Sequence, residues 1–103
     1  MQLQLAFLTS AIVSAHAAIV GTYYCTQANF TGPCAYTSAE SGTCITFSAG
    51  GFWNNAVKSM RPDTGVACTL YNAGNCTGTT FPVKASLGTI NWPNKVASSY
   101  SCT

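Results

Sequence analysis

Apolar and polar residues alternate over short stretches along most of the chain, and no long stretch repeats its apolar positions with the period of a helix. These stretches are rich in β-branched and aromatic residues, which favour strands, and turn-forming residues separate them. We predict strands over residues 19–26, 34–38, 43–48, 56–60, 66–71, 79–84, 87–91 and 96–102. A set of about eight short strands joined by turns predicts an all-β Greek-key sandwich.

Turn signals divide the predicted strands into two halves. Residues 38–42 read as a loop, and the glycine pair at residues 50 and 51 reads as a flexible hinge. The sequence Pro-Asp-Thr-Gly at residues 62–65 is a strong turn signal. We therefore predict one domain made of repeat one, residues 18–64, and repeat two, residues 65–103.

An eight-residue pattern occurs once in each half. It covers residues 25–32 in the first half and residues 71–78 in the second. Each copy has an anchor residue, four spacer residues, a second anchor, one further residue and then Gly32 or Gly78. The tetrad Asn-x-Thr-Gly fills the same four positions in both copies, so the chain is predicted to use one structural unit twice.

Residues 1–17 have the features of a secretory signal peptide. Residues 3–13 are largely apolar, and Ala15-His16-Ala17 forms a small-x-small cleavage pattern, although no Lys or Arg precedes the apolar segment. A membrane anchor needs about 20 apolar residues, and this segment is shorter. We expect cleavage after Ala17 and a secreted domain over residues 18–103.

The chain has six cysteines, an even number that predicts three disulfides in a small secreted domain. Each disulfide is expected to stabilise the fold by about 2–4 kcal/mol. A zinc site is disfavoured because the chain lacks a Cys-x-x-Cys pair and His16 falls in the predicted signal peptide. Spacing alone does not pair the cysteines, which are Cys25, Cys34, Cys44, Cys68, Cys76 and Cys102.

Charged residues make up 6% of the chain, and the net charge is +2. The four bases are scattered, so no patch for nucleic acid or anionic lipid is predicted. Glu40 and Asp63 are the only side-chain carboxylates, and the only histidine lies in the predicted signal peptide. Ser-His and Cys-His nucleophile systems are therefore excluded from the mature domain, and we expect neither an enzyme nor a bound cofactor.

Two sequons for N-glycosylation begin at Asn29 and Asn75. They lie in equivalent turns of the two repeated patterns, where asparagine also tolerates left-handed backbone geometry. We favour glycosylation at Asn29, because Cys76 lies inside the second sequon and is expected to enter a disulfide.

The aromatic residues allow two interpretations. Tyr23, Tyr24 and Phe52 can serve as core or hairpin anchors, as aromatic side chains do in most small sandwiches. Trp53 and Trp92 flank the predicted loops, and they form either part of the core or an exposed platform for a partner.

The repeated pattern resembles the folded hairpin of βγ-crystallin domains, in which aromatic-x4-aromatic-x-Gly occurs twice. Phe30 and Tyr71 keep the aromatic positions, whereas Cys25 and Cys76 replace an aromatic anchor. A cysteine can take that place if a disulfide pins the hairpin. The resemblance covers nearly all of residues 18–103 and implies a two-repeat Greek-key sandwich. It also implies that the strands of Cys68 and Cys102 are neighbours, so we expect these two cysteines to pair.

The resemblance extends to the calcium-binding loops of that family. The loops here are residues 54–59 and 94–99, each preceded by a tryptophan. By the family pattern, one site would use the side chain of Asn55, the carbonyl of Val96 and the hydroxyl of Ser98. A second site would need Lys95 and Lys58 as ligands and should not bind calcium. Because no carboxylate is available, we expect one weak calcium site or none, with the loops bracing the turns instead.

The resemblance and the composition together imply a small secreted binding protein, similar to the toxin-like members of this fold group, that acts as a monomer. The alternative is a weak calcium-binding or purely structural extracellular module. The partner, whether a protein, a glycan or a cell surface, is not specified by the sequence.

Overall fold

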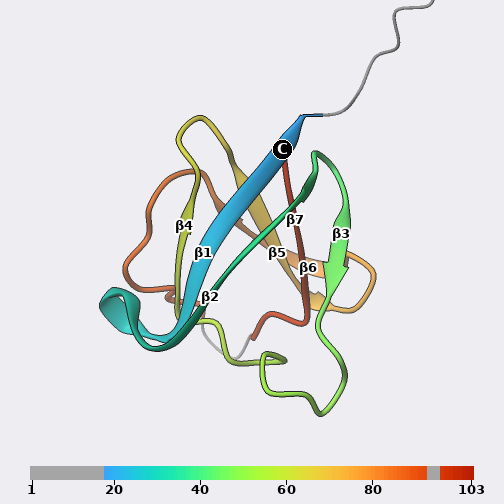
Figure 1. Cartoon of the computed structure of the whole chain (residues 1–103). Helices are drawn as coiled ribbons and strands as arrows, with labels where there is room; N and C mark the ends of the chain where they lie inside the picture. Colours follow the sequence, from blue (N-terminus) through green and yellow to red (C-terminus); the bar gives the residue numbers. More distant parts are fainter. Residues whose placement is uncertain (1–17, 93–95) are drawn as a thin grey trace, which may run out of the picture.

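The computed structural model describes residues 18–92 and 96–103, so the predicted signal peptide at residues 1–17 lies outside the described residues. The domain is built from two antiparallel sheets that face each other (Figure 1), which confirms the all-β prediction. Its strands are β1 (Ile19–Gln27), β2 (Thr31–Glu40), β3 (Cys44–Thr46), β4 (Ser59–Pro62), β5 (Cys68–Ala73), β6 (Thr77–Val83) and β7 (Ser99–Cys102).

One of the two sheets contains a strand from the other half of the chain. The strand order is β2-β1-β4 in the first sheet and β3-β7-β5-β6 in the second. β3 therefore leaves the first repeat and pairs with β7 of the second, with Ile45 opposite Tyr100. This crossing of strands between sheets is the Greek-key arrangement that the repeat predicted.

The core lies between the two sheets and follows the alternation of side chains along each strand. Thr22 and Tyr24 of β1 point inward, and Tyr24 packs against Phe47 and Tyr100 with ring centroids 6.1 and 5.8 Å apart. The fully buried side chains include Met60, Leu70 and Val83. A core of this size relies on the disulfides around it, because a domain this small buries little apolar surface.

The two repeated patterns fold into matching hairpins. In the first, Asn29, Phe30 and Gly32 have φ values of 59°, 57° and 77°, and η1 (Ala28–Phe30) is a single 3₁₀ turn. In the second, Asn75, Cys76 and Gly78 have φ values of 58°, 54° and 89°. Glycine is required last in each pattern, since it adopts a positive φ without steric cost. Figure 1 shows the hairpins on opposite sides of the sandwich.

A buried serine holds each hairpin. Ser59 Oγ accepts a hydrogen bond from the amide of Phe30 at 3.2 Å and donates one to the carbonyl of Gln27 at 2.7 Å. Ser99 Oγ accepts from the amide of Cys76 at 2.9 Å and donates to the carbonyl of Ala73 at 2.6 Å. The serines thus satisfy polar groups that each turn would otherwise leave unpaired.

All six cysteines are paired. Cys25 bonds to Cys34 within the first hairpin, and Cys44 bonds to Cys76, which ties β3 to the second hairpin. Each cysteine that stands in an aromatic position of the pattern is therefore pinned by a disulfide. Cys68 bonds to Cys102 across neighbouring strands, as the family resemblance implied.

Residues 18–92 and 96–103 form seven strands, because the segment predicted as a strand over residues 87–91 makes only one bridge, between Leu87 and Met60. It lies along β4, but the carbonyl of Gly88 accepts a hydrogen bond from the amide of Asn29 at 2.7 Å, and one further bond, from the amide of Ile90 to the carbonyl of Lys58 at 2.7 Å, joins it to the start of β4. β2 runs to Glu40 through the predicted loop, since it pairs with Ile19 at the end of β1. The strand predicted from residue 56 begins only at Ser59, after a series of turns.

Candidate functional site

The connection between β3 and β4, here called the β3–β4 loop and defined as residues 47–58, is the most prominent loop of the domain. It extends beyond the ends of the two sheets in Figure 1. Its backbone is folded into turns: the amide of Gly51 donates to the carbonyl of Ser48 at 2.8 Å, and the amide of Asn54 donates to the carbonyl of Gly51 at 3.3 Å. Gly50 supports the reversal with a φ of 76°.

Both ends of the β3–β4 loop are attached to the rest of the domain. The amide of Phe47 donates to the carbonyl of Ser98, and the amide of Lys58 donates to the carbonyl of Cys25, each at 2.9 Å. Between them, the amide of Asn55 donates to the carbonyl of Ala97 at 2.9 Å. The glycine pair predicted to be a flexible hinge is therefore part of a loop that hydrogen bonds anchor at three places.

Two adjacent aromatic residues of this loop lie in different environments. Trp53 is half-buried, and its ring meets Tyr24 edge-on with a centroid distance of 4.8 Å. Phe52 is 64% exposed, and its ring packs at right angles on Trp53 with a centroid distance of 5.2 Å. Trp92 is also half-buried and packs against Phe81. Both tryptophans thus contact the core, and Phe52 is the residue that projects outward.

The three residues expected to form a calcium site, Asn55, Val96 and Ser98, all lie among the described residues. Asn55 and Ser98 lie side by side, with Ser98 Oγ donating to Asn55 Oδ1 at 3.4 Å, while Asn94 and Lys95 lie outside the described residues. Asn55 has a left-handed φ of 63° and is exposed. These contacts are those of a braced turn, and the described residues contain no cluster of three or more His, Cys, Asp or Glu side chains that could hold a metal.

A groove with charged residues in its lining lies beside the turn that separates the two repeats. It has a volume of about 320 Å³, and its lining includes Arg61, Asp63 and Lys84. The guanidinium of Arg61 lies over the rings of Tyr23 and Phe30, at 4.8 and 5.0 Å from their centroids. One of the groove's three charged side chains is therefore already engaged in contacts on the sheet surface.

The carboxylate of Asp63 is also occupied. It accepts a hydrogen bond from Tyr36 Oη at 2.8 Å, and this bond raises the pKa of the Tyr36 phenol above its usual value. Tyr36 reaches Asp63 by lying across Gly21, where a Cβ would come within 2.5 Å of Tyr36 Cζ. Glu40, the other carboxylate, is exposed on β2.

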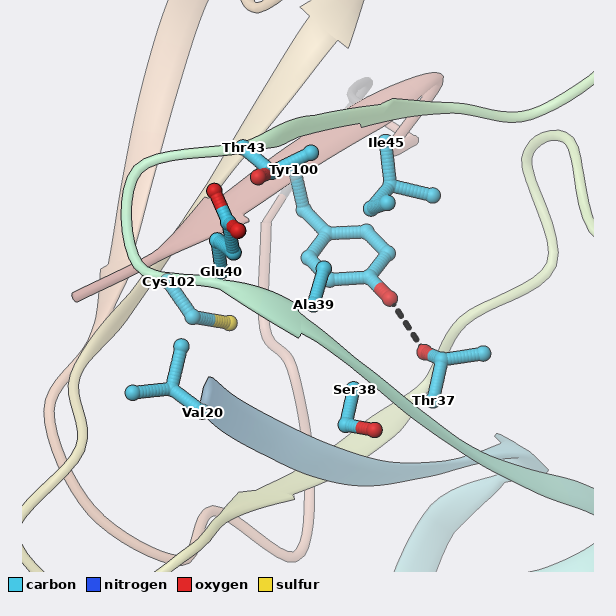
Figure 2. A pocket seen from close by; sticks show the side chains of 9 residues that line it. All are labelled: Val20, Thr37, Ser38, Ala39, Glu40, Thr43, Ile45, Tyr100 and Cys102. Atoms are coloured by element: carbon cyan, nitrogen blue, oxygen red, sulfur yellow. Dashed lines mark hydrogen bonds between the residues drawn. The ribbon is translucent and has the colours of Figure 1, made fainter. Parts of the chain in front are cut away.

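A second hollow opens between β2 and the β3–β7 pair and is too small for a ligand. Figure 2 shows Val20, Ile45 and Cys102 around it, with Tyr100 reaching across to Thr37. Its volume of about 10 Å³ admits about one water molecule. The Tyr100 hydroxyl shares a short hydrogen bond with Thr37, and burial raises the pKa of Tyr100 to about 12.

The two sequons occupy equivalent, solvent-facing turns. Asn29 and Asn75 are both exposed. The threonine of each sequon donates a hydrogen bond to the carbonyl three residues earlier, Thr31 to Ala28 at 2.8 Å and Thr77 to Gly74 at 2.6 Å. The second sequon also carries the Cys44–Cys76 disulfide.

Sequence reasoning treated Phe52 as one of several core or hairpin anchors and did not single it out. The sequence carries no local signal that sets Phe52 apart from the adjacent Trp53. In the part of the chain that the structure describes, no helix is long and apolar enough to cross a membrane.

A family model described as peptidase inhibitor family I36 matches residues 22–83, which is more than half of the chain. That family has a βγ-crystallin-like fold. The match extends from β1 to β6 and includes the whole β3–β4 loop. No curated protein sequence matches the chain.

Solved βγ-crystallin domains have the same fold. The N-terminal domain of Protein S is 22% identical, with a TM-score of 0.65, and the match covers 81% of this chain and 94% of that one. A βγ-crystallin domain from Flavobacterium johnsoniae is 21% identical, with a TM-score of 0.64 and coverage of 80% and 92%. One from Clostridium beijerinckii is 21% identical, with a TM-score of 0.63 and coverage of 80% and 95%. These matches confirm the predicted resemblance at the level of the fold.

Proposed function

The chain belongs to peptidase inhibitor family I36, and from that membership we propose that it is a secreted inhibitor that blocks a peptidase by binding to it. The family match over residues 22–83 is the observation that carries this proposal. The sequence alone did not specify the partner, and under this proposal the partner is a peptidase. Whether the protein acts as a toxin or an effector depends on which organism's peptidase it inhibits.

The fold suits an inhibitor that acts by binding alone. Protein inhibitors of peptidases change shape little on binding, and a rigid domain keeps the entropic cost of association low. Here three disulfides and the two buried serines fix the hairpins and strands around a small core. The β3–β4 loop projects from that rigid frame.

No catalytic role is needed for this function. The carboxylates of Asp63 and Glu40 are exposed, and that of Asp63 already accepts the hydrogen bond of Tyr36. The proposal therefore assigns the protein a binding surface and no reacting group. The paired cysteines are consistent with secretion, because such bonds persist in oxidising compartments.

The proposal is tested with the purified mature domain, residues 18–103, against one peptidase each of the serine, cysteine, aspartic and metallo classes. Residual activity is measured with small chromogenic substrates after preincubation. We expect stoichiometric inhibition in at least one class. A sample that has been reduced and alkylated serves as the control and should not inhibit. Full activity of every peptidase at micromolar concentrations of the native domain would contradict the proposal.

A further inference from the structure

Phe52 is the exposed apolar side chain that is best placed to meet a partner. Three large hydrophobic residues are more than half exposed in the described part of the chain: Ile19, Tyr36 and Phe52. Ile19 stands at the start of β1, and the hydroxyl of Tyr36 is bound to Asp63. Phe52 lies in the projecting loop with 64% of its surface in solvent, where it gains free energy by entering an apolar pocket.

The side chain of Phe52 packs on other aromatic rings of the domain. Its ring packs edge-on against Trp53, and Trp53 packs edge-on against the buried Tyr24. The loop backbone is held by hydrogen bonds to Cys25, Ala97 and Ser98. Little freedom remains to be lost when a partner binds, which is the property that makes an exposed aromatic residue an energetic anchor.

The sequence on either side of Phe52 is uncharged. Residues 47–57 contain no acidic or basic side chain, and Lys58 follows at the end of the loop. An apolar anchor with a neutral polar border fits a hydrophobic pocket and offers nothing to a pocket that ends in a carboxylate. Such carboxylates define peptidases that cleave after basic residues, whereas hydrophobic slots define those that cleave after large apolar residues.

We propose that Phe52 is the anchor with which this protein fills the specificity pocket of its target, and that the target is a peptidase selective for large apolar residues. This inference rests on the proposed inhibitory function. The backbone around Phe52 is turned rather than extended, with the amide of Ala56 donating to the carbonyl of Trp53 at 3.2 Å. The loop therefore inserts a side chain and presents no substrate-like strand, so the chain stays intact in the complex.

The test compares a chymotrypsin-like and a trypsin-like serine peptidase, together with any enzyme that the four-class panel shows to be inhibited. Inhibition constants are measured for the native domain, for Phe52→Ala and for Ile19→Ala, an equally exposed control. Phe52→Ala should weaken inhibition of an apolar-specific peptidase by roughly 30-fold or more, the size expected for a hot-spot residue. Ile19→Ala should change it by less than about threefold. Both variants should keep the native melting temperature, because both side chains are exposed.

The outcomes separate this inference from the proposed function. If the native domain inhibits and Phe52→Ala inhibits equally well, Phe52 is not the anchor and the inhibitory function stands. If the native domain inhibits only the trypsin-like enzyme, the assignment of an apolar pocket is overturned. If it inhibits no peptidase, the proposed function fails and the anchor fails with it. Cleavage within residues 47–58, detected by intact mass after prolonged incubation, would contradict the claim that the loop inserts a side chain and stays intact.

Discussion

Ser59 and Ser99 occupy equivalent positions in the two halves of the protein, and each makes one accepted and one donated hydrogen bond to its own hairpin. Both are fully buried. Replacing either with alanine leaves an amide and a carbonyl of the hairpin unpaired, so we expect a loss of about 1–3 kcal/mol in the free energy of unfolding. Urea unfolding monitored by tryptophan fluorescence measures this loss. The exposed Ser38→Ala variant should change stability by less than about 0.5 kcal/mol, and an equal effect in all three variants would contradict the role of the buried pair.

Removing the hydroxyl of Thr22 should stabilise the domain, whereas removing that of Ser59 or Ser99 should destabilise it. The Thr22 hydroxyl is buried and has no hydrogen-bond partner among residues 18–92 and 96–103. Thr22→Val removes the unpaired hydroxyl and keeps the shape, so we expect the domain to gain about 1 kcal/mol. Thr37, directly opposite on β2, is the matched control, because its hydroxyl bonds to Tyr100 and Tyr24. Thr37→Val should destabilise. The expectation for Thr22 is wrong if both variants lose stability in the same urea assay.

The buried phenol of Tyr100 should make stability depend on alkaline pH. Burial raises the pKa of Tyr100 to about 12, above the ordinary value of 10.0. The folded state therefore keeps a proton that the unfolded chain releases, and the stabilisation is complete below pH 10 and is lost as the pH rises towards 12. We expect a fall of about 1–2 kcal/mol over this window. Urea unfolding of the native domain and of Tyr100→Phe at several pH values measures it. An identical slope in the two proteins would exclude Tyr100 as the cause.

Calcium should bind weakly or not at all. The loop that holds Asn55 and Ser98 offers neutral oxygens, whereas calcium sites of useful affinity include carboxylates. Titration calorimetry with millimolar calcium should show at most one site, with a dissociation constant of about 1 mM or weaker. Asn55→Asp adds a carboxylate at the exposed position and should tighten any site that exists, whereas Asn55→Ala should abolish it. Tight binding at two sites would contradict the expectation.

Glycosylation should favour the first sequon. Asn29 and Asn75 are both exposed, but Cys76 within the second sequon is joined to Cys44 on β3. We expect oxidation of Cys76 in the secretory pathway to restrict access to Asn75. Intact mass before and after glycosidase treatment of protein from a glycosylating host measures occupancy. Asn29→Gln should remove most of the glycan mass and Asn75→Gln little of it. The reverse result would contradict the preference.

The sequence alone predicted the fold because its strongest signals are local. Gly32 and Gly78 are needed where the chain turns with a positive φ, and Asn29 and Asn75 adopt the left-handed geometry that asparagine tolerates. These requirements are steric and act between neighbouring residues, so a single sequence displays them. Their repetition predicted the two hairpins, and the alternation between them predicted the sheets.

Tertiary structure decided everything that depends on residues far apart in the chain. The spacing of the cysteines could not pair Cys44 with Cys76, because that bond follows from the exchange of β3 between sheets. The segment at Leu87 makes a single bridge to β4, and the neighbouring Gly88 bonds instead to the distant Asn29. Phe52 and Trp53 are neighbours of similar character, yet the core has room for one ring beside Tyr24 and the other is left in solvent. Which of two equivalent side chains is buried depends on the space that the rest of the fold provides, and no local pattern contains that information.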